Sequence, residues 1–125
     1  MLNGAELFAK LVEAKYTLFN GTGEQQSRQL CFETFPQAIA CALAGEIVSA
    51  KRKRRVRRNL LDRTNFDTSK LTNIDEIDAA LCAFTAHQLA LNNFKCYGDA
   101  TDGIIVVPGR PLQAQKDLGK QESKH

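Results

Sequence analysis

The apolar positions of the chain fall into periodic segments separated by short polar stretches. Residues 4–15 repeat apolar side chains at helical spacing, and so do residues 37–44, which follow Pro36 and precede Gly45. Proline suits the first turn of a helix, and glycine readily adopts the left-handed conformation that ends one. The pattern therefore predicts two amphipathic helices in the first part of the chain.

Two short segments between these helices have the composition of β-strands. Residues 16–19 precede an Asn-Gly-Thr-Gly turn signal at residues 20–23, and residues 29–35 follow it with aromatic and β-branched side chains. We expect the two segments to form a hairpin-like antiparallel pair, with a connection longer than a tight turn.

The centre of the chain predicts two further helices. The third begins near Ser49, an acceptable N-cap, and runs to about Leu61 with Val56 among its few apolar anchors. The fourth begins after Asn73, because Asn73 can cap the helix and Glu76 can return the interaction from three residues later. Its apolar stripe consists of Ile74, Ile77, Leu81 and Phe84.

The last part of the chain changes from apolar to polar. Residues 97–103 are expected to form a loop in which Asp99 and Asp102 serve turn formation. Residues 104–107 predict a short buried strand. Residues 109–125 lack any hydrophobic period and predict a disordered polar tail, which leaves one folded domain over residues 1–108.

The composition indicates a soluble, cytoplasmic protein. The chain has 125 residues, 43% of them hydrophobic, and this suffices for one domain with a real core. Its apolar runs are far shorter than the roughly 18 residues of a membrane span, so we expect no membrane contact. The four cysteines form no metal-binding pattern and are expected to be buried, reduced thiols.

The positive charge is concentrated in one segment, although the net charge is only +3. Residues 51–58, KRKRRVRR, are basic at every position except Val56. Like charges in successive turns of a helix repel one another, and this repulsion costs stability unless an acidic partner is present. Nucleic-acid phosphate is the simplest partner, and a solvated helix face is the alternative. The candidate nucleic-acid-binding residues are Lys51, Arg52, Lys53, Arg54, Arg55, Arg57 and Arg58.

Three acidic residues are candidates for metal binding. Asp75 and Asp78 are three positions apart, so they share one helix face and are close enough to share a metal ion. The helix dipole also explains Asp75, whereas Asp78 lies past the first turn and has no local explanation. Glu33 shares its strand face with Cys31 and Phe35 and is either an ordinary edge-strand carboxylate or a metal ligand.

Four blocks of sequence carry a resemblance to a known family. In order they are FETFPQAIACALAG, a basic helix ending in RRNLL, NIDEIDAALCAFTA and YGDATDGIIVVP. Over residues 7–108, the chain resembles the C-terminal half of an uncharacterised prokaryotic family of predicted nucleases with an RNase H-like fold.

The resemblance implies a partial α/β domain with three to four helices, the two-stranded pair and a short C-terminal strand. It also implies metal-dependent phosphodiester hydrolysis, with Glu33, Asp75 and Asp78 as the catalytic carboxylates. They would bind two Mg²⁺ or Mn²⁺ ions about 4 Å apart, and such hard cations prefer carboxylate ligands.

The sequence departs from this family at its beginning. Family members begin with Asp-bearing sheet strands, and the chain has no room for them before Leu7. We therefore expect the N-terminal sheet strands to be missing and the chain to be inactive on its own. The alternatives are a nucleic-acid-binding module without catalysis, or a domain that pairs with a second copy or a complementing chain through the strand edge at residues 29–35.

Overall fold

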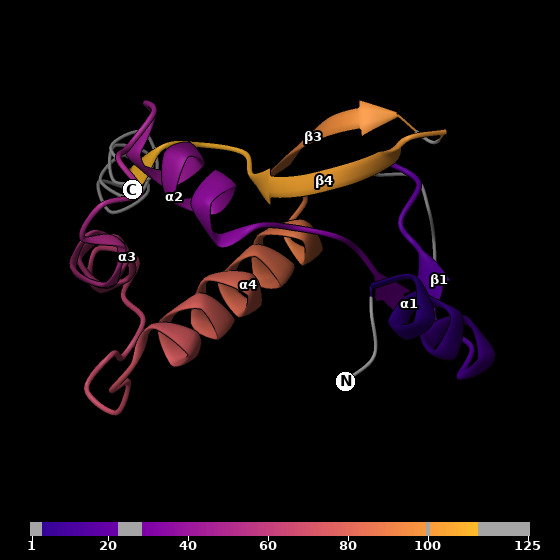
Figure 1. Ribbon diagram of the computed structural model, residues 1–125. Helices are drawn as coiled ribbons and strands as arrows, with labels where there is room; N and C mark the ends of the chain where they lie inside the picture. Colours follow the sequence, from indigo (N-terminus) through magenta and orange to yellow (C-terminus); the bar gives the residue numbers. More distant parts are fainter. Residues whose placement is uncertain (1–3, 23–28, 100, 113–125) are drawn as a thin grey trace, which may run out of the picture. The chain divides into compact units, whose positions relative to one another are not determined.

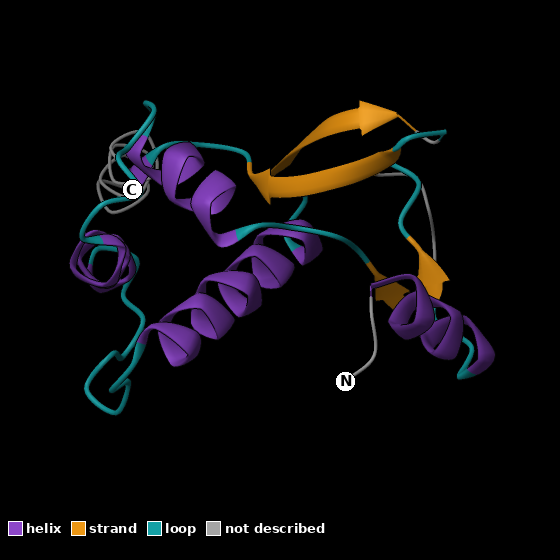
Figure 2. Ribbon diagram, viewed as in Figure 1, coloured by secondary structure: helices purple, strands orange, loops and turns teal. Residues whose placement is uncertain are grey.

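The computed structural model describes residues 4–22, 29–99 and 101–112 of the chain. The described residues form four helices and four short strands (Figures 1 and 2). The strands make two separate two-stranded sheets, β1 with β2 and β3 with β4, so the class is mixed α/β, as predicted. In chain order the elements are α1 (Gly4–Glu13), β1 (Thr17–Leu18), β2 (Leu30–Cys31), α2 (Pro36–Ala44), α3 (Lys53–Asp62), α4 (Ile74–Ala90), β3 (Phe94–Asp99) and β4 (Gly103–Pro108).

The chain divides into two compact units. Unit 1 comprises Met1–Glu33 and Cys96–Val106, and unit 2 comprises Thr34–Lys95 and Val107–His125. The β3–β4 hairpin starts in unit 2, runs into unit 1 and returns. No helix in the described part of the chain is long and apolar enough to cross a membrane.

Unit 2 is built around the packing of α2, α3 and α4. The predicted apolar positions face inward, because Ile39, Leu61, Ile77 and Leu81 are completely buried. Leu112 joins this core at 5% exposure, so the described chain stays packed four residues beyond Pro108. The rest of the predicted tail, residues 113–125, lies outside the described residues.

The predicted ends of α2 and α4 are confirmed. Gly45 ends α2 in the left-handed conformation, with φ of 78°. Asn73 caps α4, because its Oδ1 accepts a hydrogen bond from the backbone N–H of Glu76 at 2.9 Å. The return contact differs from the prediction, since the Glu76 carboxylate accepts from the side chains of Asn73 and Thr72 at 2.9 and 2.8 Å. The cap is therefore a side-chain network around the first turn.

The predicted start of α3 is wrong. The helix begins at Lys53, and Arg52 occupies the N-cap position with φ of 54° and no side-chain capping hydrogen bond. Ser49 instead accepts a hydrogen bond from the backbone N–H of Lys51 at 3.1 Å. Ser and Thr side chains form such local turns as readily as helix caps, so a serine before a basic run does not fix the helix start.

The predicted antiparallel pairing in unit 1 is also wrong. β1 and β2 run parallel, with Thr17 opposite Leu30 and Leu18 opposite Cys31. A parallel pair requires the chain to return to the same end of the sheet, which only a long connection permits. The segment between Leu18 and Leu30 is far longer than a hairpin turn, and this length makes the parallel arrangement possible.

The β3–β4 hairpin contains one strand that the sequence analysis missed. β3 includes residues 97–99, which were expected to be loop, and β3 and β4 run in opposite directions (Figure 1). The turn begins at Asp99, whose Oδ1 accepts hydrogen bonds from the backbone N–H groups of Thr101 and Asp102 at 2.9 and 2.7 Å. The predicted turn role of Asp99 is thus confirmed.

Candidate functional site

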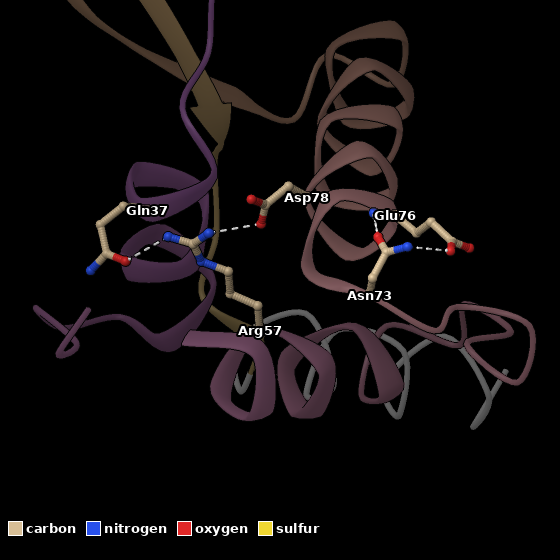
Figure 3. A network of polar contacts seen from close by, with 5 residues as sticks. All are labelled: Gln37, Arg57, Asn73, Glu76 and Asp78. Carbon is tan, nitrogen blue, oxygen red and sulfur yellow. Dashed lines mark hydrogen bonds and ion pairs between the residues drawn. The ribbon is translucent and has the colours of Figure 1, made fainter. Parts of the chain in front are cut away.

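A partly buried ion pair joins two helices of unit 2. Nη1 of Arg57, on α3, is 2.7 Å from Oδ1 of Asp78, on α4 (Figure 3). The Arg57 side chain is 7% exposed and that of Asp78 is 25% exposed. Arg57 is buried because it lies three and four residues before Leu60 and Leu61, on the face of α3 that enters the core. Asp78, which lacks a local explanation in the sequence, therefore has a tertiary one.

Gln37 of α2 extends this ion pair into a network across three helices. Nη2 of Arg57 donates to Oε1 of Gln37 at 3.1 Å, and Nε2 of Gln37 donates to the carbonyl oxygen of Val48 at 2.7 Å. Nε of Arg57 is buried and has no hydrogen-bond partner among the described residues. The Arg57 guanidinium thus links α3 to α4 and to α2, and Gln37 in turn holds the loop between α2 and α3.

Arg58 and Arg54 also have partners within unit 2. Nη1 of Arg58 donates to the carbonyl oxygen of Thr68 at 3.1 Å, and Nη2 donates to that of Leu71. Nη2 of Arg54 donates to the carbonyl oxygen of Thr72 at 2.9 Å. These two arginines of the basic segment therefore support the loop that leads into α4.

Four residues of the basic segment have exposed side chains. Lys51, Arg52, Lys53 and Arg55 are exposed, and within the described residues no acidic or hydrogen-bonding group contacts their side chains. They surround the start of α3, which has no acidic residue in its first turn and no side-chain cap. The unsatisfied N–H groups of a helix start carry partial positive charge. Positive side chains and the helix dipole therefore concentrate like charge at one place.

Asp75 and Asp78 lie on one face of α4 but differ in environment. Asp75 is exposed in the first turn, whereas Asp78 is partly buried and gives one oxygen to Arg57. Glu33 belongs to unit 1, where its backbone forms a parallel bridge with Ile105 and its carbonyl oxygen accepts from the N–H of Val106 at 2.9 Å. Its side chain is exposed.

A shared metal site of Glu33, Asp75 and Asp78 stays a prediction. Within each unit, the described residues contain no group of three or more His, Cys, Asp or Glu side chains arranged to hold a metal ion. Asp75 and Asp78 supply two carboxylates from adjacent turns of α4, and both are hard oxygen donors.

All four cysteines are free thiols. Only Cys31 is fully buried, whereas Cys41, Cys82 and Cys96 are half-buried. Cys82 lies one turn after Asp78 on α4, and burial raises the pKa of its thiol, with a further contribution from the Asp78 charge. Burial likewise raises the pKa of Cys31 and Cys96. Their raised pKa values disfavour the reactive thiolate form.

The fold and these contacts define a mixed α/β protein. Its helical core is hydrophobic and lies beside an ion pair, and its basic segment is partly exposed. The chain belongs to the family described as Protein of unknown function (DUF429), whose model matches residues 1–102. This match contains α1 to α4 and β3, together with Glu33, Asp75, Asp78 and the whole basic segment. No curated protein and no solved structure matches the chain significantly.

Proposed function

We propose that this protein binds nucleic acid and that an exposed basic cluster holds the phosphate backbone. The observation that carries the proposal is the exposed cluster formed by Lys51, Arg52, Lys53 and Arg55, which has no acidic partner within the described residues. Arg54 lies in the same turn and is also exposed, although its guanidinium donates to a backbone carbonyl.

The physical argument is electrostatic. Four like charges beside a helix start repel one another and the helix dipole, and this arrangement costs folding free energy. A phosphate group bound there would remove the repulsion and accept hydrogen bonds from Lys and Arg, with release of condensed counterions. Arg57 and Arg58 are excluded from this role, because the core and the loop before α4 already use their guanidinium groups.

The test is binding of fluorescently labelled single-stranded and duplex oligonucleotides, measured by anisotropy over a range of salt concentrations. Neutralising the cluster in a K51Q/R52Q/K53Q/R55Q variant should weaken binding at least tenfold and lower the slope of log K against log salt by about three. A control variant with the same net charge, K10Q/K15Q/K70Q/K95Q, removes exposed lysines elsewhere. Equal losses in both variants, or binding that is insensitive to salt, would contradict the proposal.

A second candidate function is metal-dependent phosphodiester hydrolysis of the RNase H-like type. It is favoured by the position of Asp75 and Asp78 on one face of α4 and by the sequence resemblance to predicted nucleases. Asp75 and Asp78 would hold Mg²⁺ or Mn²⁺, and the bound cations would supply an activated water and stabilise the leaving oxygen. Arg57 would act as a positioning residue, since it fixes one oxygen of Asp78 and leaves the carboxylate partly exposed.

Its test is cleavage of DNA and RNA in Mg²⁺ or Mn²⁺ and its loss in EDTA. D75N is the more informative variant, because Asp75 is exposed and its substitution leaves the partly buried ion pair intact. Activity that disappears in D75N while the unfolding transition stays unchanged would support catalysis. A folded wild-type chain that is inert with both metals would reject catalysis by this chain alone, whatever its binding affinity.

A further inference from the structure

Unit 1 contains an apolar cavity of about 290 Å³ that neither proposed function uses. Its walls are mostly hydrophobic and come from α1, from β1 and the residue after it, and from the hairpin. Of the described residues that line it, Asn20 and Glu33 have polar side chains, and the apolar walls are formed by Phe8, Leu18, Phe19 and Ile104. The cavity is thus an apolar hollow with acidic character.

The Glu33 carboxylate has no counter-charge among the described residues. Within the described residues, no group donates a hydrogen bond to it and no cation pairs with it. Its Oε2 lies 3.9 Å from the position that a Cβ atom on Gly103 would occupy, and Gly103 also lines the cavity. The backbone of Glu33 is fixed by its bridge to Ile105, so the carboxylate is presented from a paired strand position.

We propose that this cavity binds a small ligand that carries an ammonium group on a compact apolar body. The ammonium group would pair with the Glu33 carboxylate, and the apolar body would fill the space between the hydrophobic walls. Phe8 and Phe19 supply aromatic rings, whose faces attract cations. The volume is at the lower end of the range for ligand pockets, which suits about ten non-hydrogen atoms.

Three other ligand classes fit this cavity less well. A hard divalent cation needs several oxygen ligands, and the lining offers one carboxylate and one side-chain amide among apolar groups. An anion such as phosphate would meet the Glu33 charge with no cation to offset it. A neutral apolar molecule would fill the walls but would leave the carboxylate without a partner.

The experiment is a titration of the ¹⁵N-labelled protein with benzylamine near neutral pH, followed by amide chemical shifts. Saturable shifts confined to residues near the cavity, such as Phe19 and Ile104, are expected in the millimolar range. E33Q should weaken binding about tenfold, because a charge-assisted hydrogen bond is replaced by a neutral one. E13Q removes an exposed acid from α1 and should bind like wild type. Benzyl alcohol, which lacks the charge, should bind as weakly as benzylamine binds to E33Q.

Three results would overturn the proposal. The first is the absence of saturable shifts in a folded protein, as judged from its amide spectrum. The second is equal affinity of benzylamine for wild type and E33Q, or of benzylamine and benzyl alcohol for wild type. The third is saturable broadening of the same amides by micromolar Mn²⁺ that blocks benzylamine, because this would assign Glu33 to a metal site. None of these results bears on phosphate binding at residues 51–55, so the two proposals fail separately.

Discussion

Arg57 and Asp78 form one ion pair, although the sequence assigned them to two different chemistries. Their side chains meet at 2.7 Å inside unit 2, where Gln37 receives the second arm of the guanidinium. The residue expected to bind phosphate and the residue expected to bind metal therefore stabilise each other and the helical core.

Removal of either partner should destabilise the fold. D78N leaves the buried Arg57 charge uncompensated and should lower the free energy of unfolding by about 3 kcal/mol, as measured by urea denaturation. R57M should cost less, about 1–2 kcal/mol, because Asp78 retains some contact with solvent. R55M, in the same helix, should change stability by less than about 0.5 kcal/mol. A D78N protein as stable as wild type would show that the pair contributes nothing.

The capping network of α4 predicts a contrast between two polar residues. N73A removes the side chain that accepts from the backbone N–H of Glu76, and it should cost about 1 kcal/mol of unfolding free energy. S49A should cost well under that, roughly 0.3 kcal/mol, because Ser49 holds only an exposed turn. Thermal denaturation followed by circular dichroism compares the two variants, and equal effects would contradict the assigned helix starts.

The two glycines beside the hairpin turn, Gly98 and Gly103, should differ in how well they tolerate substitution by alanine. Both have positive φ, 101° at Gly98 and 104° at Gly103. A Cβ atom at Gly98 would overlap the carbonyl oxygen of Gly103, whereas the nearest described atom to one at Gly103 is Oε2 of Glu33, at 3.9 Å. G103A should therefore cost about 1–2 kcal/mol from backbone strain alone, and G98A about 3 kcal/mol or more. Amide hydrogen exchange in β3 and β4 reports the local loss, and the order of the two variants is the decisive result.

The raised pKa of Cys82 predicts a decline in stability at alkaline pH. The unfolded thiol ionises near its ordinary pKa of about 9, while burial and Asp78 keep the folded thiol protonated to higher pH. Its contribution is complete below that pH and is lost as pH rises through the folded value. C82A should therefore lose less stability than wild type between about pH 8 and 10, as measured by urea denaturation at each pH. Parallel pH profiles would show that Cys82 makes no such contribution.

The burial of Leu112 indicates that the helical core includes residues beyond the hairpin. L112A removes a side chain that is only 5% exposed and should cost about 2–4 kcal/mol. I47A truncates an isoleucine that is 95% exposed and should cost less than about 0.5 kcal/mol. Equal unfolding midpoints for the two variants in urea would place Leu112 outside the core.

The elements that the sequence predicted correctly are those that local chemistry determines. Pro36 and Gly45 delimit α2, and Asn73 caps α4, because these residues act on the backbone next to them. The parallel pairing of β1 with β2 was not predictable in this way, since strand direction depends on the path of a long connection. β3 could have been found from its alternation, because Phe94 and Cys96 are half-buried while the residues after each are exposed.

The contacts of the candidate residues could not be predicted from the sequence. A basic run was visible, and its period could have shown that Arg57 shares a face with Leu60 and Leu61. No local pattern indicates that an arginine will enter a core, because this requires an acidic partner from a distant helix. Asp78 was the residue without a local explanation, and its partner is 21 positions away in the sequence.

The interrupted course of the chain through unit 1 has a consequence for the order of folding. The three helices of unit 2 are contiguous within Thr34–Lys95, whereas unit 1 needs a segment made before these helices and another made after them. During synthesis from the N-terminus, α2, α3 and α4 can assemble while the first segment still lacks its hairpin partner. Unit 1 can close at the Glu33–Ile105 bridge only after the second of its two segments has been made.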